Sequence, residues 1–210
     1  MEDHSLSAHD ALERLREGNR RFATGELSRD TRPSYSTVAA SAEQGPFAIV
    51  LGCSDSRVSA ELVFGQGVGD LFVIRVAGNI VAPSQVGSVE FAAARFGTRL
   101  VVVLGHTGCG AVLATLDELQ QPAEDQSPNL RSIVDRVRPS VEGLLRSELL
   151  HDREALVQQA VRANVGVSVE HLRYGSEVLE RLIRDEGLRI VGAEYSLETG
   201  FVEFFDDTGS

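Results

Sequence analysis

Apolar residues fall into two kinds of pattern along this chain, and together the patterns predict an α/β fold. Four short, mostly apolar runs, each followed by a turn-forming residue or a change of pattern, are typical of buried strands. These expected strands are Phe47–Leu51, Leu71–Val76, Leu100–Leu104 and Leu188–Tyr195. A fifth run, Phe201–Phe205, follows the last of them after the turn sequence SLETG, which predicts a hairpin at the edge of the sheet.

Apolar residues at intervals of three and four positions predict helices before and between the strands. The first expected helix is Ser7–Phe22, whose apolar residues share one face. The others are Ser59–Phe64, Ser84–Phe96, one that begins near Cys109, Leu130–Leu150, Arg153–Tyr174 and Glu177–Glu186. Pro139 and Gly143 are candidate interruptions of the long helix. The polar segment Glu26–Glu43 is expected to run over the surface as an arm.

Length and composition agree with one α/β domain over residues 1–210. The chain is long enough for a sizeable core, and its 42% hydrophobic and 24% charged residues are ordinary globular values. No internal repeat or low-complexity tract divides the sequence. We therefore expect a helix and arm over residues 1–45 and an α/β core over residues 46–205.

Charge and cysteine content narrow the choice of partner and compartment. The net charge of −11 argues against a nucleic acid or an anionic membrane as partner. No apolar run reaches the roughly 18 residues of a membrane span. The acidic, polar start MEDHSLSAHD argues against a signal peptide. Two cysteines far apart in the sequence, without a secretion signal, indicate a reduced, cytoplasmic protein.

Two of the expected strands end in turns that carry soft metal ligands. Cys53 begins the sequence CSDSR just after the first strand, and His106 and Cys109 lie in GHTGCG just after the third. Parallel strands would present these residues at their carboxyl ends, where open α/β sheets place their ligands. A helix that starts at Cys109 would favour its thiolate through free N–H groups and the helix dipole. Cys53, His106 and Cys109 are therefore a candidate zinc site with one open position.

The residues that follow Cys53 fit such an open position. A catalytic zinc needs a free coordination position, because a water bound there has a pKa near neutrality. Asp55 lies two residues after Cys53, within reach of the fourth position. Arg57 lies two residues further and can hold the Asp55 carboxylate in a bidentate pair. The segment thus contains a potential ligand and a residue able to hold it off the metal.

Three other interpretations of the same residues stay open on spacing alone. Cysteines at strand ends can be buried core residues, and His-x-x-Cys recurs by chance. A structural zinc site is a second interpretation, although it would normally have four firm ligands in a small domain. A redox pair is a third, although this chain has no C-x-x-C motif. The histidines His4, His151 and His171 lie in polar contexts and are expected at the surface.

CSDSR and GHTGCG, in this order and each after an apolar strand, resemble the two signatures of the β-class carbonic anhydrases, Cys-x-Asp-x-Arg and His-x-x-Cys. FVIRVAGN at residues 72–79 also matches that family, and the similarity extends from about Ala11 to Phe205. The resemblance implies a central, mostly parallel β-sheet of four parallel strands plus an antiparallel edge strand. Helices would flank the sheet, with an N-terminal helical arm. It also implies a homodimer or a higher assembly of dimers.

The resemblance further implies reversible hydration of carbon dioxide to bicarbonate and a proton, by attack of zinc-bound hydroxide. One Zn²⁺ per chain would be bound by Cys53, His106 and Cys109. Asp55 and Arg57 would be the catalytic pair, with Asp55 as a possible fourth ligand in a closed state. Substrate-binding positions of the family fall on Gln44, Phe72, Ala77, Phe91 and Gly110. The family's glutamine reaches the pocket of a dimer mate, although read singly Gln44 could be a surface residue and the three apolar side chains core residues.

Two alternative functions fit the same scaffold. One is hydrolysis of another small cumulated molecule, such as carbon disulfide, by the same zinc cluster. The other is a non-catalytic zinc-binding or assembly protein, against which Asp55 and Arg57 argue, because a purely structural site needs no such pair.

One position departs from the pattern of family members that carry a second, non-catalytic bicarbonate site. That site resembles a trio of tryptophan, arginine and tyrosine. Arg75 and Tyr195 match two of its members, but Val50 stands at the tryptophan position and offers no N–H donor. We therefore expect an open zinc site at near-neutral pH and no cooperative inhibition by bicarbonate. Arg75 and Tyr195 are expected to serve structure, for instance by bonds to the backbone.

Overall fold

Five strands form one sheet in the order β2-β1-β3-β4-β5 in the computed structural model, which describes residues 6–27, 44–121 and 127–205. The strands are β1 Ala48–Gly52, β2 Leu71–Arg75, β3 Leu100–His106, β4 Arg189–Tyr195 and β5 Val202–Phe205. The first four are parallel to their neighbours, and β5 runs antiparallel to β4. The expected mostly parallel sheet with an antiparallel edge strand is confirmed, including the hairpin at its end.

The two central strands are buried on both faces. Every residue of β1 and of β3 is buried, as expected for parallel strands covered by helices on either side. Polar residues do not alternate with apolar ones in these strands, because the side chains on both faces of the sheet point into apolar layers. The register pairs Gly52 of β1 with Leu104 of β3. The residues that follow these two strands therefore lie side by side at the carboxyl ends of the strands.

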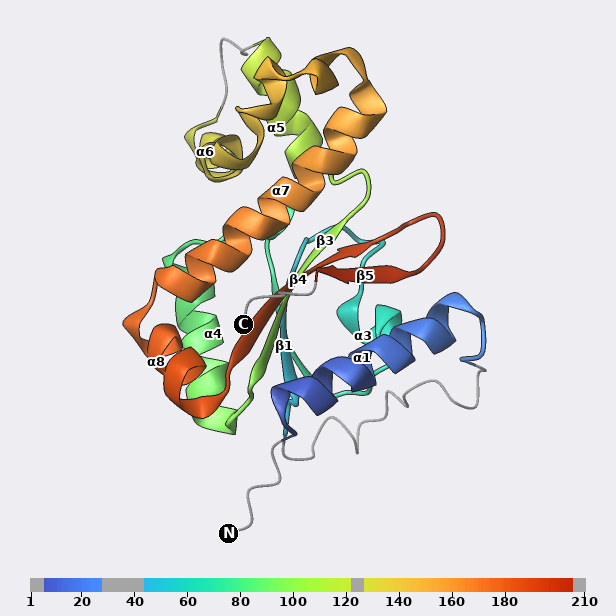
Figure 1. The fold of residues 1–210 in the computed structure, drawn as a ribbon, viewed down its shortest axis with the longest axis vertical. Helices are drawn as coiled ribbons and strands as arrows, with labels where there is room; N and C mark the ends of the chain where they lie inside the picture. The colour runs from blue at the N-terminus through green and yellow to red at the C-terminus, as the bar shows by residue number, and fades with distance from the viewer. Residues whose placement is uncertain (1–5, 28–43, 122–126, 206–210) are drawn as a thin grey trace.

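Helices cover both faces and one end of the sheet (Figure 1). They are α1 Ala8–Ala23, α3 Ala60–Val63, α4 Pro83–Phe96, α5 Gly110–Gln120, α6 Pro128–Val141, α7 Arg153–Tyr174 and α8 Glu177–Glu186, with 3₁₀ turns η1 Ala77–Asn79, η2 Leu144–Arg146 and η3 Glu148–His151. One core cluster joins α1 and α3 to one face of the sheet, and a second joins α4, α7 and α8 to the other. A third cluster lies beyond the carboxyl ends of the strands, where α5, α6 and the start of α7 pack together around Cys53 and Cys109.

The expected helix Leu130–Leu150 is wrong in its second half. The helix α6 ends at Val141, and the chain continues through the two 3₁₀ turns η2 and η3 before α7 begins. Pro139 is tolerated in the last turn of α6, and the break comes at the adjoining segment that contains Gly143. Leucines of the two 3₁₀ turns pack against the third core cluster, so tertiary contacts override the helical periodicity there.

Several expectations concern segments that are exposed or outside the described residues. His151 and His171 are exposed, as predicted, whereas His4 lies outside the described residues. The expected arm lies outside them too, except for its first two residues.

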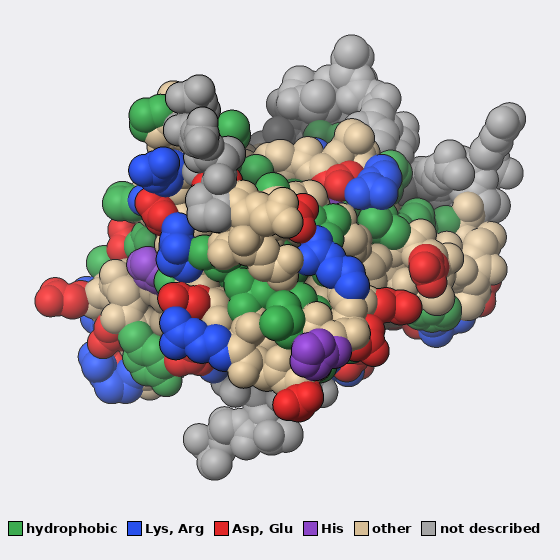
Figure 2. Space-filling view, turned by 90° about the horizontal axis from the view of Figure 1, so that it is seen from above, with side chains coloured by type: hydrophobic (Ala, Val, Ile, Leu, Met, Phe, Trp, Pro, Cys, Tyr) green, Lys and Arg blue, Asp and Glu red, His purple; other side chains and the backbone are tan. Residues whose placement is uncertain are grey.

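None of the helices in the described part of the chain combines the length and hydropathy of a transmembrane span. On the face that Figure 2 shows, acidic and basic side chains are interspersed rather than gathered by sign.

The helix α7 approaches the sheet closely where β3 and β4 carry glycine. A Cβ atom at Gly105 would lie 2.5 Å from Cγ2 of Val165, and one at Gly192 would lie 2.9 Å from Cγ1 of the same valine. Val165 is fully buried and β-branched, so its side chain has little freedom to move aside. The two glycines therefore set how near α7 can lie to the strands.

We expect Gly105→Ala to lower the free energy of unfolding by about 1–3 kcal/mol, because the added methyl group overpacks this contact. Guanidinium denaturation of the variant and the wild type measures the difference. Gly87→Ala is the matched control, since Gly87 lies exposed within α4 and a Cβ there meets nothing within 4 Å. The control should be as stable as the wild type or slightly more stable. A Gly105→Ala protein that unfolds with the control would refute the close contact.

Candidate metal centre

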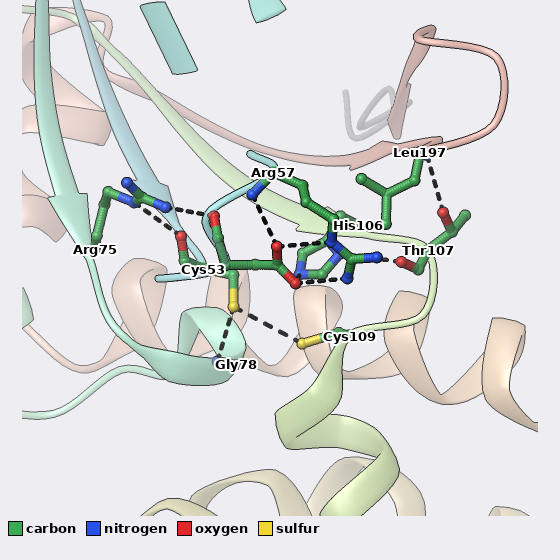
Figure 3. Close-up of polar contacts among 9 residues, drawn as sticks. Cys53, Arg57, Arg75, Gly78, His106, Thr107, Cys109 and Leu197 are labelled. Carbon is green, nitrogen blue, oxygen red and sulfur yellow. Dashed lines mark hydrogen bonds and ion pairs between the residues drawn. The ribbon is translucent and has the colours of Figure 1, made fainter. Parts of the chain in front are cut away.

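Cys53, His106 and Cys109 meet at the carboxyl edge of the sheet (Figure 3). Cys53 follows β1 directly, His106 is the last residue of β3, and Cys109 is the N-cap of α5. One ligand atom from each residue lies within 4.8 Å of the other two, and all three side chains are buried. The two sulfur atoms are 4.0 Å apart. Parallel pairing of β1 with β3 thus brings together residues that are more than 50 positions apart in the sequence.

The imidazole of His106 presents Nε2 to the two sulfur atoms. Its Nδ1 lies 3.0 Å from the carbonyl oxygen of Thr107, which can only accept a hydrogen bond, so Nδ1 carries a proton. Nε2 is buried and has no hydrogen-bond partner among the described residues. A buried nitrogen without a partner costs about 1–3 kcal/mol. A metal ion bound to Nε2 would remove that cost, as in the usual histidine–metal arrangement.

The two cysteine sulfurs lie within hydrogen-bonding distance of each other, at 4.0 Å. A hydrogen bond from the Cys109 thiol lowers the pKa of Cys53, and the resulting thiolate together with burial raises the pKa of Cys109. Burial alone would lower the pKa of His106, but the nearby Cys53 sulfur, the hydrogen bond to Thr107 and the charge of Asp55 raise it. The pocket therefore favours positive charge at its centre. A divalent cation at the cluster would balance the charge of the deprotonated sulfurs.

A backbone N–H completes the surroundings of Cys53. Gly78, in the turn η1, donates its N–H to the sulfur of Cys53 at 3.4 Å (Figure 3). Gly78 has the left-handed dihedral φ of 71°, which glycine adopts without strain. We did not anticipate this contact from the sequence. The local signal is the Gly-Asn pair in η1, after β2, which is typical of left-handed turns.

Asp55 is held by Arg57 in the bidentate pair that the spacing predicts. Nε of Arg57 lies 2.9 Å from Oδ1 of Asp55, and Nη2 lies 2.7 Å from Oδ2. The backbone N–H of Arg57 also donates to Oδ1, at 2.9 Å. These bonds hold the pKa of Asp55 well below its usual range, so its carboxylate stays ionised at neutral pH. Oδ2 lies 3.9 Å from Nε2 of His106, which places the carboxylate beside the cluster.

Arg75 fixes the backbone of the same segment. Its Nε donates to the carbonyl oxygen of Cys53 at 3.0 Å, and its Nη2 donates to that of Asp55 at 2.6 Å. The expectation that Arg75 bonds to the backbone is confirmed. Tyr195, at the end of β4, is buried, and burial raises the pKa of its hydroxyl. Val50 is fully buried in β1.

The turn between His106 and Cys109 is tied to the end of β4. Thr107 donates its N–H to the carbonyl oxygen of Tyr195 at 3.0 Å, and its Oγ1 accepts from the N–H of Leu197 at 3.0 Å. The role of Thr107 was not predicted. Its position in GHTGCG is the available signal, because threonine hydroxyls often bond to the backbone of turns.

The five expected substrate-binding residues divide into two groups in space. Gly110 begins α5 directly after Cys109, and Ala77 begins η1 next to the Gly78 that bonds to Cys53. Both therefore lie at the cluster.

Phe72, Phe91 and Gln44 lie elsewhere in the described chain. Phe72 pairs with Ile49, four residues before Cys53, or about 13 Å along the strand. Its ring packs 6.1 Å from that of Phe91, whose side chain is 54% exposed. Gln44 is exposed and precedes β1, at the opposite end from the cluster. These three residues do not lie at the cluster of their own chain.

Known proteins are similar to this chain over most of its length. Residues 48–202 match the family model described as carbonic anhydrase. Over 204 residues the chain is 36% identical to carbonic anhydrase 2 of Mycobacterium tuberculosis (strain H37Rv), covering 95% of this chain and 94% of that protein. The carbonic anhydrase of Mycolicibacterium smegmatis is also 36% identical, over 201 residues, with coverage of 95% and 94%.

Solved structures give the same answer for the fold. The β-carbonic anhydrase CafA of Aspergillus fumigatus superimposes with a TM-score of 0.70 at 26% identity, covering 94% of this chain and 90% of that chain. A crystal structure from work on two tetrameric β-carbonic anhydrases of Sordaria macrospora superimposes with a TM-score of 0.71 at 23% identity, covering 95% and 96%. Sequence, fold and residue cluster agree, and the chain is an enzyme of the β-class carbonic anhydrase family.

Proposed function

We propose that this enzyme hydrates carbon dioxide reversibly through one zinc ion held by Cys53, His106 and Cys109. The observation that carries the proposal is the convergence of three buried ligand atoms within 4.8 Å, one of them an imidazole nitrogen without a partner. Two thiolates and an imidazole are a donor set that favours zinc over magnesium or calcium. Asp55 lies beside the cluster but is held by Arg57, which leaves a fourth position for water.

Zinc in this position would supply a Lewis acid that lowers the pKa of water toward neutrality, so that hydroxide attacks carbon dioxide at physiological pH. The residues of the chain orient the reacting groups. Oδ2 of Asp55 accepts a hydrogen bond from the attacking O–H and so directs an oxygen lone pair toward the substrate. Arg57 keeps that carboxylate ionised and turned in one direction. The Gly110 N–H, in the first turn of α5, has no partner within the helix and would donate to the bicarbonate oxygens.

Carbon disulfide hydrolysis is the second candidate, because it could use the same ligands. The similarity to two mycobacterial carbonic anhydrases along nearly their whole length favours carbon dioxide as the substrate.

Two free, buried cysteines 4.0 Å apart support a reducing, cytoplasmic location.

The function is tested by stopped-flow hydration of carbon dioxide with a pH indicator, alongside elemental analysis. We expect about one zinc ion per chain in the wild type and loss of both zinc and activity in Cys109→Ala, since two protein ligands hold zinc poorly. His151→Ala is the matched control, because this histidine is exposed and lies outside the cluster. A wild type that contains zinc, hydrolyses carbon disulfide and leaves carbon dioxide unchanged would select the second candidate. Full zinc content in folded Cys109→Ala would remove Cys109 from the site.

Arg57→Ala tests the pair beside the metal. Without the guanidinium group, Asp55 is free to turn toward the cluster and occupy the fourth position. We expect hydration to slow by about 10- to 100-fold while zinc content stays normal. Arg146→Ala, which removes an exposed i,i+4 ion pair with Glu142, should leave the rate unchanged. A crystal structure of Arg57→Ala with Asp55 still turned away would contradict this role.

We also propose that two copies associate through the β2 side of the sheet. β2 is an edge strand, and its outer hydrogen-bonding groups have no partner strand among the described residues. Beside it, the rings of Phe72, Phe91 and Phe96 form a cluster with centroid separations of 6.1, 6.1 and 5.9 Å. Phe91 is more than half exposed and packs against the other two rings, so the exposed apolar surface here is contiguous rather than a single side chain. Association here would bring Phe72, Phe91 and Gln44 toward a second copy.

Phe91→Asp should dissociate the assembly into monomers or lower its association constant by at least about 100-fold. In an interface with two-fold symmetry, each new carboxylate would face apolar surface or the same carboxylate of the other copy. Sedimentation velocity over a range of concentrations measures this change. Phe201→Asp is the matched control, since Phe201 is 48% exposed but lies beside β5 at the far edge of the sheet. An assembly that survives Phe91→Asp and dissociates in Phe201→Asp would move the interface to β5.

A further inference from the structure

The turn η1 holds two consecutive residues in the left-handed region. Gly78 has a φ of 71°, and Asn79 has a φ of 43°. A non-glycine residue in this region costs about 1–3 kcal/mol and persists only where its surroundings fix it, although asparagine tolerates it better than most. The N–H of Gly78 is the group that bonds to the sulfur of Cys53. Whatever holds η1 therefore also aims this donor.

Two buried polar side chains of α7 hold the turn. Nδ2 of Asn164 donates to the carbonyl oxygen of Gly78 at 2.8 Å. Oγ of Ser168, one helical turn later, donates to the carbonyl oxygen of Asn79 at 3.0 Å. The N–H of Asn79 bonds to the carbonyl oxygen of Val76 at 3.0 Å. Together these bonds fix the peptide planes that follow Gly78 and Asn79. The N–H of Gly78 belongs to the plane before Gly78, which is joined to the fixed planes through the φ and ψ angles of that residue.

The residue types at these two helical positions call for an explanation. Asparagine and serine are weaker helix formers than alanine or leucine, and burial of their polar groups costs free energy unless they are bonded. Asn164 is 2% exposed and Ser168 is 4% exposed, within a helix face that otherwise buries Val161, Val165 and Val169. Apolar side chains there would pack on the turn equally well, but they would leave two buried carbonyl oxygens without a donor.

The turn η1 is closely packed by neighbouring helices and cannot shift as a whole. A Cβ atom at Gly78 would lie 3.0 Å from Cβ of Ala111 in α5 and 3.6 Å from Cγ2 of Val137 in α6. The turn η1 is thus enclosed by α5, α6 and α7. If the bonds from α7 were lost, the peptide planes of η1 could rotate even though the turn stayed in place.

We propose that Asn164, assisted by Ser168, is a positioning residue for the metal centre that acts through the Gly78 N–H on the sulfur of Cys53. This inference rests on the proposed binding of a metal ion by Cys53, His106 and Cys109. A hydrogen bond to a thiolate withdraws negative charge from the sulfur and fixes the direction of its lone pairs, and such outer contacts tune bound metals. Asn164 and Ser168 touch neither the metal ligands nor the substrate.

The test uses the full-length protein with cobalt(II) in place of zinc, because thiolate-to-cobalt charge-transfer absorption reports directly on the sulfur ligands. In Asn164→Ala, the charge-transfer bands should shift, and cobalt should pass to the chelator EDTA about 10- to 100-fold faster than from the wild type. Ser168→Ala removes one hydroxyl and should shift the bands in the same direction by a smaller amount. If Asn164→Ala does not fold, Ser168→Ala decides the question.

Asn19→Ala is the matched control. Asn19 is also buried in a helix and donates to two backbone carbonyl oxygens, those of Val63 at 3.1 Å and Gly200 at 2.9 Å. Its loss should lower the melting temperature like that of Asn164, without any change in the cobalt spectrum or release rate. Wild-type bands and release rates in Asn164→Ala and Ser168→Ala would overturn this inference while leaving the metal site intact. A wild type without charge-transfer bands would overturn the proposed metal site and this inference together.

Discussion

Parallel pairing of β1 with β3 is the contact on which the rest of the structure depends. The register sets Gly52 opposite Leu104, and the next residues of each chain segment lead to Cys53 and His106. Because side chains alternate between the faces of a strand, a slip of one residue would send every side chain of β1 to the opposite face. Both strands are buried on both faces, so the register is specified by two apolar layers. The core thus fixes the geometry of the cluster.

Strands, most helices and the residues of the cluster could be predicted because their signals are local. Apolar runs mark the strands, and the sequences CSDSR and GHTGCG carry the potential ligands directly after two of them. The bond from Gly78 to Cys53 could not be predicted, because it depends on a turn whose shape is fixed by α7, almost 90 residues later. The break after α6 was missed in its extent for a similar reason, since leucines of the following turns find their partners in the tertiary core.

The cluster concentrates negative charge inside the protein. Two sulfur atoms and the carboxylate of Asp55 lie around one imidazole, and Arg57 is the cation that faces them from the open side. Burial of such charges costs free energy unless a cation balances them. Arg57 is largely exposed and is paired with the carboxylate, so most of the balance for the sulfurs must come from protons or from a bound ion. Binding of a cation at this cluster would therefore be linked to folding.

The close approach of α7 to Gly105 and Gly192 has a consequence for motion at the metal centre. The valine that fills this contact is adjacent in sequence to Asn164, which holds the turn beside Cys53. The donor at Gly78 and the central strands therefore belong to one cooperative unit, in the sense used for native-state hydrogen exchange. Exposure of the Gly78 amide to solvent would then be coupled to movement of α7 relative to the sheet. Flexibility that substrate entry requires must then come from the exposed side of the site, around Asp55, Arg57 and the turn after His106.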